Sequence, residues 1–411
     1  MTILLQKLKN IPRIDYINYL ILLYAFTLSF PSEIKRVIVI LMILLWLTDR
    51  TKYDFKLPKT NLFLFFWLFI GYCLLSYFWS DVSFKEALSY IKRYWYYLPI
   101  FIIFKYLKKE FFEYAISSFF LGMLISEILS YGNFFNLWQV GIGNSDNPRV
   151  FLHHTMYSMF LSVTSIFLLF KIIDSKKTKL KFFYLLFFIT VNINLLFNSG
   201  RTGYFALVIT IFLMILIKYR INLKIISSTI ILISFIFMTF YTYSEHFKKR
   251  INFIQSDISS LIKEKNYNTS LGARFGFWII ANEITKDSYF FGIGIDNHIK
   301  QKDLYIKEHN LEKEFKHISE LKHFHNIYLE IYTQLGLVGL FFFTLMIISL
   351  LKIKIQNNMI NNLKISTILL FLIGGFVDNL FHLNYTITLF CFIMGICLAQ
   401  YKFESQTIIQ K

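Results

Sequence analysis

Long apolar stretches separated by short polar segments run along most of the chain. Most of the stretches are roughly 16–25 residues long, the length that a helix needs to cross a hydrocarbon core of ~30 Å. In lipid the backbone must satisfy its own hydrogen bonds, so we interpret these stretches as helices and not as strands. The pattern predicts an all-α, polytopic membrane protein with about twelve spanning helices, at residues 14–31, 35–48, 61–79, 91–107, 110–131, 150–171, 181–198, 203–218, 224–242, 326–351, 365–380 and 384–401.

Lysine and arginine are distributed unevenly over the segments between these helices. If the N-terminus is cytoplasmic, the inside segments carry many of them, as in the run Lys176, Lys177 and Lys179, whereas the short outside loops carry few. This bias follows the positive-inside rule. It predicts cytoplasmic termini and three regions: helices one to nine in residues 1–243, a periplasmic helical loop in residues 244–324, and helices ten to twelve in residues 325–411.

The predicted periplasmic loop is more polar than the rest of the chain. In it, Ile251, Ile254 and Ile258 recur at a spacing that is typical of an amphipathic helix. A second helix is expected after Ser270, a suitable N-cap, and a third, highly charged stretch spans residues 301–322. A segment of about 80 residues between spanning helices is long enough to carry function.

The composition excludes some partners and cofactors. The net charge of +18 would suggest nucleic acid for a soluble protein, but here many of the basic residues lie in short loops, where they set the topology. No nucleic-acid-binding motif is present, so we expect no nucleic-acid partner. Cys73, Cys391 and Cys397 lie inside apolar stretches without metal-ligand spacing, so neither a disulfide framework, a metal nor a cofactor is expected.

Two arginines lie at the outer ends of predicted helices, next to glycines. Arg201 lies in Asn-Ser-Gly-Arg-Thr-Gly, before the eighth helix, and Arg274 lies in the first turn of a predicted loop helix. A helix start offers free N–H groups, and arginine adds a planar fork that matches phosphate oxygens. The glycines let a backbone approach a ligand closely. The pattern favours a phosphate site, although each arginine alone is equally well explained by contact with lipid headgroups.

A histidine stands where the predicted loop returns to the membrane. His325 lies in Lys-His-Phe-His-Asn-Ile-Tyr-Leu-Glu, at the start of the tenth helix. Histidine exchanges a proton near neutral pH, so His325 is a candidate general base. Asn326 and Glu330 are one helical turn apart and are expected to orient it. His323 is expected to be structural.

Three further charged residues lie near the outer ends of predicted helices. Arg149 precedes the sixth helix, and Arg93 leads the fourth, where a topology charge and a substrate contact are equally good explanations. Asp378 lies near the outer end of the eleventh helix, where an unpaired acid is costly. We expect these three residues, with Asn326 and Glu330, to bind substrate.

Together the motifs resemble the O-antigen ligase family and the related O-antigen polymerases. The resemblance rests on Arg-Thr-Gly at residues 201–203, Ser-Leu-Gly-Ala-Arg at residues 270–274, and His-x-His-Asn at residues 323–326, which leads into Leu-Gly-Leu-Val-Gly-Leu. It covers most of the chain and is strongest in residues 270–340. The motifs are short, and their order on a frame of spanning helices makes the match specific.

The resemblance implies a glycosyltransferase that takes a glycan from a polyprenyl-diphosphate carrier. Its acceptor would be the lipid A core of lipopolysaccharide, on the periplasmic face of the inner membrane. Its fold would be GT-C-like, and its reaction would be inverting and metal-independent. By the same resemblance, Arg201 and Arg274 hold the diphosphate and His325 takes the proton of the acceptor hydroxyl. The family's extra basic residue in an early outer loop has two candidates here, Lys85 and Arg93.

Three other functions are open at this stage. An O-antigen polymerase would use the same donor and a growing glycan as acceptor, but polymerases often have two large basic outer loops and only one is predicted here. A non-catalytic flippase or transporter of lipid-linked glycans would place charges at the bilayer midplane and show inverted repeats, and the sequence does neither clearly. A structural scaffold would leave the outer-end arginines and histidine unexplained.

The charge bias predicts which parts of the chain a membrane-impermeant thiol reagent reaches. In a background without native cysteines, a cysteine at Tyr305 should be labelled from outside. A cysteine at Thr178 should react only after the membrane is permeabilised. The reverse labelling pattern would exclude the predicted topology.

Overall fold

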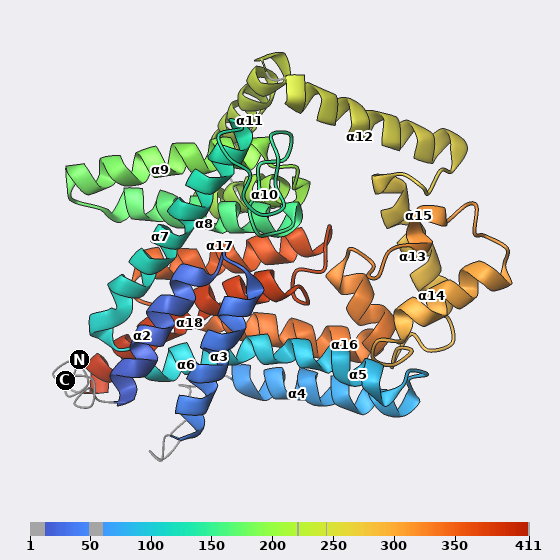
Figure 1. The fold of residues 1–411 in the computed structure, drawn as a ribbon, viewed down its shortest axis with the longest axis horizontal. Coiled ribbons are helices and arrows are strands. Elements are labelled where there is room, and N and C mark those ends of the chain that lie inside the picture. Colours follow the sequence, from blue (N-terminus) through green and yellow to red (C-terminus); the bar gives the residue numbers. More distant parts are fainter. Residues whose placement is uncertain (1–12, 49–60, 220–221, 244, 410–411) are drawn as a thin grey trace.

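Helices make up the regular structure of the described chain. The computed structural model describes residues 13–48, 61–219, 222–243 and 245–409 (Figure 1). Ser244 and the basic residues expected inside at 1–12, 49–60, 220 and 411 lie outside these ranges. Within the ranges no strand occurs, and the extended pairing is limited to an isolated bridge between Asn144 and Asn147. The helices are α2 (Arg13–Thr27), α3 (Ser32–Leu47), α4 (Leu62–Leu75), η1 (Ser76–Trp79), α5 (Phe84–Ile91), η2 (Lys92–Tyr97), α6 (Leu98–Tyr106), α7 (Lys109–Phe134), α8 (His154–Asp174), α9 (Thr178–Phe197), α10 (Arg201–Tyr219), α11 (Leu223–Tyr243), α12 (Glu245–Glu264), α13 (Ser270–Ile284), α14 (Asn297–Glu308), α15 (Lys316–Ser319), α16 (Ile327–Lys352), α17 (Asn358–Gly375) and α18 (Asn384–Ile409).

The predicted spanning segments all overlap helices of the structure. Helices α2 and α3, with 15 and 16 residues, are shorter than the ~20 residues that an untilted span needs. Seven helical segments in the described ranges are long and apolar enough to cross a membrane: Leu62–Trp79, Lys109–Phe134, His154–Asp174, Thr178–Phe197, Arg201–Tyr219, Ile327–Lys352 and Asn384–Thr407. The chain is therefore an all-helical, multi-pass membrane protein.

Three predicted segments have different bounds in the structure. The fourth, at residues 91–107, is divided between the 3-10 helix η2 and the helix α6, and a capping box at Ser83 starts the separate helix α5 before it. Pro99 stands in the first turn of α6, where its missing N–H leaves no helical bond unmade. The sixth segment becomes helical only at His154. The eleventh ends at Gly375, so Asp378 lies in the turn that follows and not in the helix.

Helix α18 forms the centre of the bundle. It packs against α6, α8, α17 and η2, and 78% of its membrane window is buried inside the protein. A helix that is apolar all round belongs in a protein interior. The membrane window of α9 is only 22% buried, as expected of a helix that turns most of its surface to lipid.

The two ends of the helix bundle differ in what covers them. At one end, which we call the terminal end, the start of α2, the turn between α6 and α7 and the last turns of α18 meet. There Lys108 pairs with Asp15, and Lys402 donates to backbone carbonyls at the end of α6. At the other end, which we call the loop end, α13 and α14 pack on α16 (Figure 1). Lys300 on α14 also pairs with Asp81, just beyond η1.

The predicted loop contains the helices expected there. The apolar spacing falls in α12, the second helix is α13, and the charged stretch includes α14 and α15. Helices α13 to α15 and the start of α16 share a small apolar core, formed by Ala273, Phe277, Ile280, Ala281, Ile306, Phe315, Ile318, Phe324 and Leu329. Helix α12 extends from α11 toward this unit (Figure 1) and leaves Phe253 and Ile262 exposed.

A break in α16 fixes the loop end to the bundle. Gly336 has φ 63° and ψ −161°, a backbone conformation that favours glycine. Residues 289–294 enter the break: two of their N–H groups donate to carbonyls just before it, and two N–H groups just after it donate back to the segment. A Cβ on Gly292 would lie 2.3 Å from the Gln334 carbonyl oxygen, and one on Gly336 would lie 2.3 Å from that of Phe290. The two glycines therefore allow the close approach that satisfies the freed backbone groups.

This close approach predicts that Gly336→Ala destabilises the protein. Alanine would carry the positive φ, which costs ~1–3 kcal/mol for a residue other than glycine, and would add the clash with Phe290. We expect a lower midpoint of thermal unfolding for the purified variant. The control is Gly71→Ala in α4, because a Cβ there meets nothing within 4 Å and alanine favours a helix. Equal midpoints for the two variants would contradict the prediction.

Candidate functional site

A cavity of ≈ 670 Å³ opens at the loop end of the bundle. It lies between the start of α8, the helix α13, the segment that leads into α16, and the turn between α17 and α18. Five histidines, one arginine and one aspartate are among the side chains that line it: His153, His154, Thr155, Met156, Ser270, Ala273, Arg274, Phe277, His317, Leu321, His323, His325, Asp378 and Leu383. The cavity thus brings together residues from four separate parts of the sequence.

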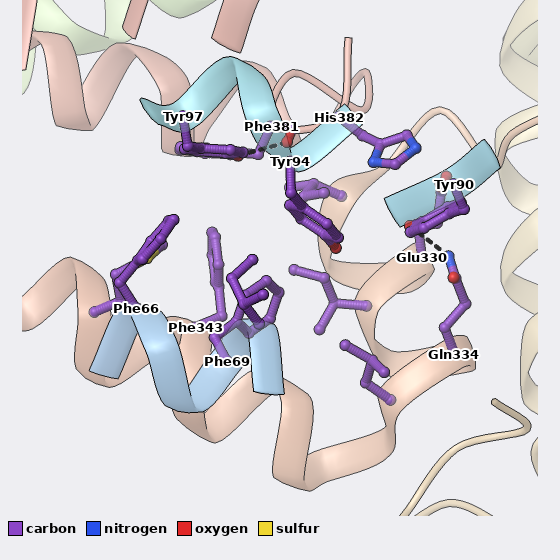
Figure 2. Close-up of a pocket in the computed structure, with 15 residues that line it drawn as sticks. Phe66, Phe69, Tyr90, Tyr94, Tyr97, Glu330, Gln334, Phe343, Phe381 and His382 are labelled. Atoms are coloured by element: carbon purple, nitrogen blue, oxygen red, sulfur yellow. Dashed lines mark hydrogen bonds between the residues drawn. The ribbon is translucent and has the colours of Figure 1, made fainter. Parts of the chain in front are cut away.

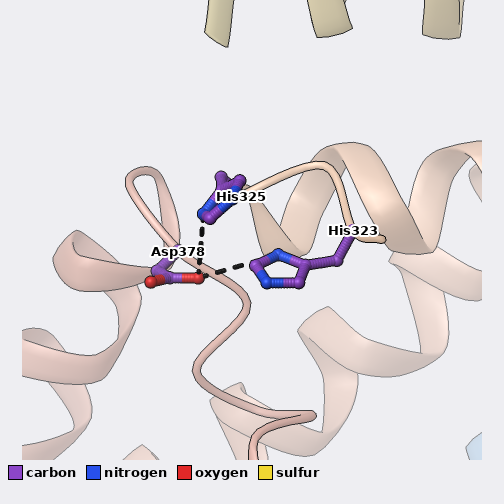
Figure 3. Close-up of side chains that lie close together, drawn as sticks. All are labelled: His323, His325 and Asp378. Carbon is purple, nitrogen blue, oxygen red and sulfur yellow. Dashed lines mark ion pairs between the residues drawn. The ribbon is translucent and has the colours of Figure 1, made fainter. Parts of the chain in front are cut away.

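Two histidines in this cavity point toward one carboxylate (Figure 3). His325 Nδ1 lies 3.4 Å from Asp378 Oδ1, and His323 Nδ1 lies 3.9 Å from the same oxygen. The two imidazole rings are in contact, with 4.0 Å between their centroids. A carboxylate beside Nδ1 selects the tautomer in which Nε2 is free to accept a proton. His325 and Asp378 therefore have the arrangement of a general base and the group that orients it.

The backbone around His325 is set by the cap of α16. Asn326 accepts hydrogen bonds from the N–H groups of Tyr328 and Leu329, which makes it the N-cap. Its amide also donates to the Phe376 carbonyl, so it ties the start of α16 to the turn that carries Asp378. His325, one residue earlier, has φ 48°, which is rare for a residue other than glycine. Such strain at a candidate site is consistent with a functional constraint.

The electrostatics of the three side chains are coupled. Burial alone would raise the pKa of Asp378, but the hydrogen bond and charge of His325, with the charge of His323, hold it below its ordinary value. Burial lowers the pKa of His323 to about 4, with a further contribution from the charge of His325, and Asp378 opposes the shift. His323 is therefore neutral near pH 7, and Asp378 is ionised.

Arg274 enters the cavity from the first turns of α13. The N-cap of this helix is Thr269, which accepts from Gly272 N, and not the predicted Ser270. Ser270 instead accepts from Nη1 of Arg274 through both its carbonyl and its hydroxyl oxygen. The Nε of Arg274 is buried without a hydrogen-bond partner in the described structure. Burial, and the charge of Arg201 to a smaller extent, lower the pKa of Arg274, while Asp378 acts in the opposite direction.

Arg201 is the first residue of α10 and reaches the same region by close helix packing. A Cβ on Gly200 would lie 2.2 Å from the His154 carbonyl, and one on Gly203 would lie 2.4 Å from that of Ser158. These glycines let α10 start directly against the start of α8, whose His154 lines the cavity. Because its charge acts on Arg274, Arg201 lies within electrostatic range of it, although about seventy residues separate the two in sequence.

Two more predicted arginines lie around the cavity. Arg149 lies in the segment between α7 and α8, where Asn133 holds its carbonyl, and its Nε and Nη1 are buried without partners in the described structure. Its charge contributes to the lowered pKa of His153, which burial dominates. Arg93, in η2, contributes to the lowered pKa of His323. Lys85, the alternative to Arg93, is exposed on α5.

Glu330 is placed differently from the expectation. It does not orient His325 but accepts a hydrogen bond from Phe324 N and lies 3.6 Å from His298 Nε2. It lines a separate small cavity of ≈ 20 Å³, together with Gln334, Tyr90 and His382 (Figure 2). That volume suits about one water molecule. Glu330 therefore positions the backbone that precedes His325, and it does not line the large cavity itself.

Sequence reasoning missed several cavity residues. His153 and His154 were not among the predicted site residues, yet both line the cavity, and His153 stands immediately before α8. The sequence could have indicated them, because a histidine pair at the outer start of an apolar stretch lies at the same membrane depth as Arg201. His317 gave no such signal, since it comes from a charged loop stretch that folds over the cavity only in three dimensions.

The cavity offers two kinds of chemistry. Arginine side chains with unmet donors suit a phosphate or diphosphate, and a histidine paired with a carboxylate suits proton transfer. One ligand atom from each of His323, His325 and Asp378 lies within 4.8 Å of the others, close enough to hold a metal ion. No metal is needed for the first two roles, and the buried carboxylate is already compensated by the histidines.

The fold and the cavity define a multi-pass membrane protein with a basic, histidine-containing site at one end of its helix bundle. Residues 182–344 match the model of the O-antigen ligase family, so this part of the chain is similar to that family. The matched segment includes Arg201, Arg274 and His325, and Asp378 lies beyond it. The chain is also 32% identical over 188 residues to an uncharacterized protein of Haemophilus influenzae, a similarity that covers 45% of this chain and 46% of that protein.

The unmet Nε donor of Arg274 predicts that inorganic pyrophosphate stabilises the purified protein against heat. Binding to the folded state alone adds about 2.7 kcal/mol at a hundredfold excess over Kd. Arg274→Met should lose this response without a lower basal unfolding midpoint, because it removes a buried cation with an unpaired donor. Arg36→Met is the control, since Arg36 is exposed and its partners among the described residues are Ser32 and Glu33. A full pyrophosphate response in Arg274→Met would exclude Arg274 from the anion site.

Proposed function

We propose that this protein is an O-antigen ligase type of glycosyltransferase. It transfers a glycan from a polyprenyl-diphosphate carrier to the lipid A core of lipopolysaccharide, with inversion and without a metal ion. The observation that carries the proposal is one cavity at the end of a membrane bundle, where Arg274, with Arg201 in electrostatic range of it, lies beside a histidine–carboxylate pair. A diphosphate leaving group and an acceptor hydroxyl need these two kinds of group side by side.

The proposed reaction is a single displacement at the anomeric carbon. His325 Nε2 takes the proton from the acceptor hydroxyl while the hydroxyl oxygen forms the new bond to that carbon. The bond from the carbon to the diphosphate oxygen breaks, and the electron pair leaves with the diphosphate. Arg201 and Arg274 stabilise the negative charge that develops there, and Asp378 stabilises the protonated His325. Arg149 and Arg93 flank this centre and bind the remaining negative charge or the sugar.

We further propose a topology of about twelve spans in the inner membrane, with cytoplasmic termini and a periplasmic loop at residues 244–324. The lysines of the terminal end support this orientation, because Lys108, Lys364 and Lys402 gather at the end that the positive-inside rule assigns to the cytoplasm. The cavity then opens at the periplasmic face. A membrane-anchored carrier presents its diphosphate at that depth.

Deletion of the gene distinguishes the proposed ligase from a polymerase of the same family. Lipopolysaccharide from the deletion strain is separated on a gel and compared with the parent. Loss of all glycan-capped bands supports the ligase. Survival of a band with a single-unit cap would assign the protein as a polymerase, and unchanged lipopolysaccharide would overturn both.

The histidine assignment predicts a large kinetic defect for His325→Ala. General-base assistance typically contributes ~10²–10⁴-fold to a rate, so transfer between purified lipid-linked donor and acceptor should fall by about this factor. His323→Ala should lose less activity, because its imidazole lies farther from Asp378. His309→Ala is the control, since His309 is exposed on α14. Wild-type turnover in His325→Ala would show that the proton is taken by another group.

The pH dependence of transfer separates the two histidines further. Activity should fall on the acid side of neutrality, because a general base must be unprotonated to act. The fall in activity on the acid side should be unchanged in His323→Ala, because the pKa of His323 is about 4 and this residue stays neutral near pH 7. Asp378→Asn should lower the turnover number, because its carboxylate orients His325 and balances the positive charge that forms on it in the reaction. An acid limb that moves only in His323→Ala would reverse the assignment.

A further inference from the structure

A second large cavity lies at the terminal end of the bundle, away from the site described above. Its volume is ≈ 540 Å³, which is in the range of ligand pockets. Three helices form it, with their apolar side chains as walls and their polar residues mostly at the ends: Ile166, Leu169, Phe170, Ile173 and Asp174 of α8, Thr210, Ile211, Met214, Ile215, Ile217, Lys218 and Tyr219 of α10, and Asn358, Met359, Asn362 and Ser366 of α17.

The depth of this cavity matches one leaflet of a bilayer. On each of the three helices the lining extends about two turns inward from the helix end, which is ~12 Å along the axis. The hydrocarbon core of a membrane is ~30 Å thick, so the cavity ends before the midplane. Because α8 and α10 both qualify as membrane spans, the apolar walls lie at the level of the acyl chains.

The mouth of the cavity carries one charge of each sign. Asp174 ends α8 and Lys218 lies in the last turn of α10, and both side chains are exposed. No ion pair joins them in the described structure, although they line the same opening. The side-chain amides of Asn358 and Asn362 stand beside them and make no hydrogen bond to any other described residue. The opening therefore presents an acceptor, a cation and two amides to an occupant.

We propose that this cavity binds one phospholipid with a zwitterionic headgroup, from the leaflet at the terminal end. The headgroup ammonium pairs with Asp174, the phosphate pairs with Lys218 and the two amides, and an acyl chain fills the apolar part. An anionic headgroup would satisfy Lys218 but would meet the negative Asp174. A protein segment would bring backbone polar groups into apolar walls that cannot satisfy them. The proposal is independent of the glycan-transfer activity, because it concerns the opposite end of the bundle.

Native mass spectrometry of the purified full-length protein tests this site. The protein is mixed with equal amounts of phosphatidylethanolamine and phosphatidylglycerol that have the same acyl chains, and the retained lipid is counted. We expect about threefold more phosphatidylethanolamine, as one exposed charge contact would give. Asp174→Asn should bring the ratio close to one, and Lys218→Gln should reduce retention of both lipids. Glu110→Gln and Lys176→Gln make the same charge changes at this end outside the cavity and should keep the wild-type ratio.

Several outcomes would overturn the proposal. Equal retention of the two lipids by the wild-type protein, or a ratio that Asp174→Asn leaves unchanged, would mean adventitious lipid only. An excess of phosphatidylglycerol that disappears in Lys218→Gln would assign an anionic lipid instead. A mass equal to two chains, lost in Ile173→Asp, would make this surface an interface between copies. The wild-type ratio is measured first, so the test does not depend on the folding of any variant.

Discussion

The exchange of backbone hydrogen bonds at the break in α16 is the constraint on which the candidate site depends. Residues 289–294 can satisfy the broken helix only because Gly292 and Gly336 lack side chains. Contacts next to the break connect it to the loop end. The side chain of Gln334 accepts a hydrogen bond from Asp296 N at the start of α14, and His298 of α14 lies against Glu330. Glu330 in turn holds Phe324 N, one residue before His325. The strained conformation of His325 is thus fixed from the interior of the bundle.

The arginines of the site are placed at an energetic cost that an anion would remove. Arg149 and Arg274 have buried donors without partners in the described structure, and burial lowers the pKa of both. An unpaired buried charge is destabilising, and two like charges close together add repulsion. Arg201 contributes that repulsion to Arg274. These groups support the proposed diphosphate, which would supply both the opposite charge and the missing acceptors.

The sequence was sufficient for the helices because lipid allows few alternatives. An apolar stretch of about twenty residues can hardly be anything but a helix there, so α7, α8, α16 and α18 follow from length and hydropathy. The contacts of single residues could not be predicted in the same way. Glu330 was expected beside His325 because of its spacing along one helix, but its partner comes from α14, which no local pattern relates to α16. Asp378 was predicted to lie in a helix, but α17 ends at Gly375. The position of that end depends on how the following turn packs, which the apolar pattern does not indicate.

The structure also distinguishes two uses of basic residues that look alike in the sequence. At the terminal end, Lys108 pairs with Asp15, Lys171 with Glu113, and Lys402 donates to carbonyls at a helix end. Positive charges at helix C-termini satisfy free carbonyls and the helix dipole, so these lysines need no further partner. At the loop end, Nε and Nη1 of Arg149 and Nε of Arg274 are buried without partners in the described structure, beside helix starts that already carry partial positive charge. Burial without a partner is unfavourable for an arginine that only sets the topology. The buried donors of the loop-end arginines therefore support the proposed anionic substrate.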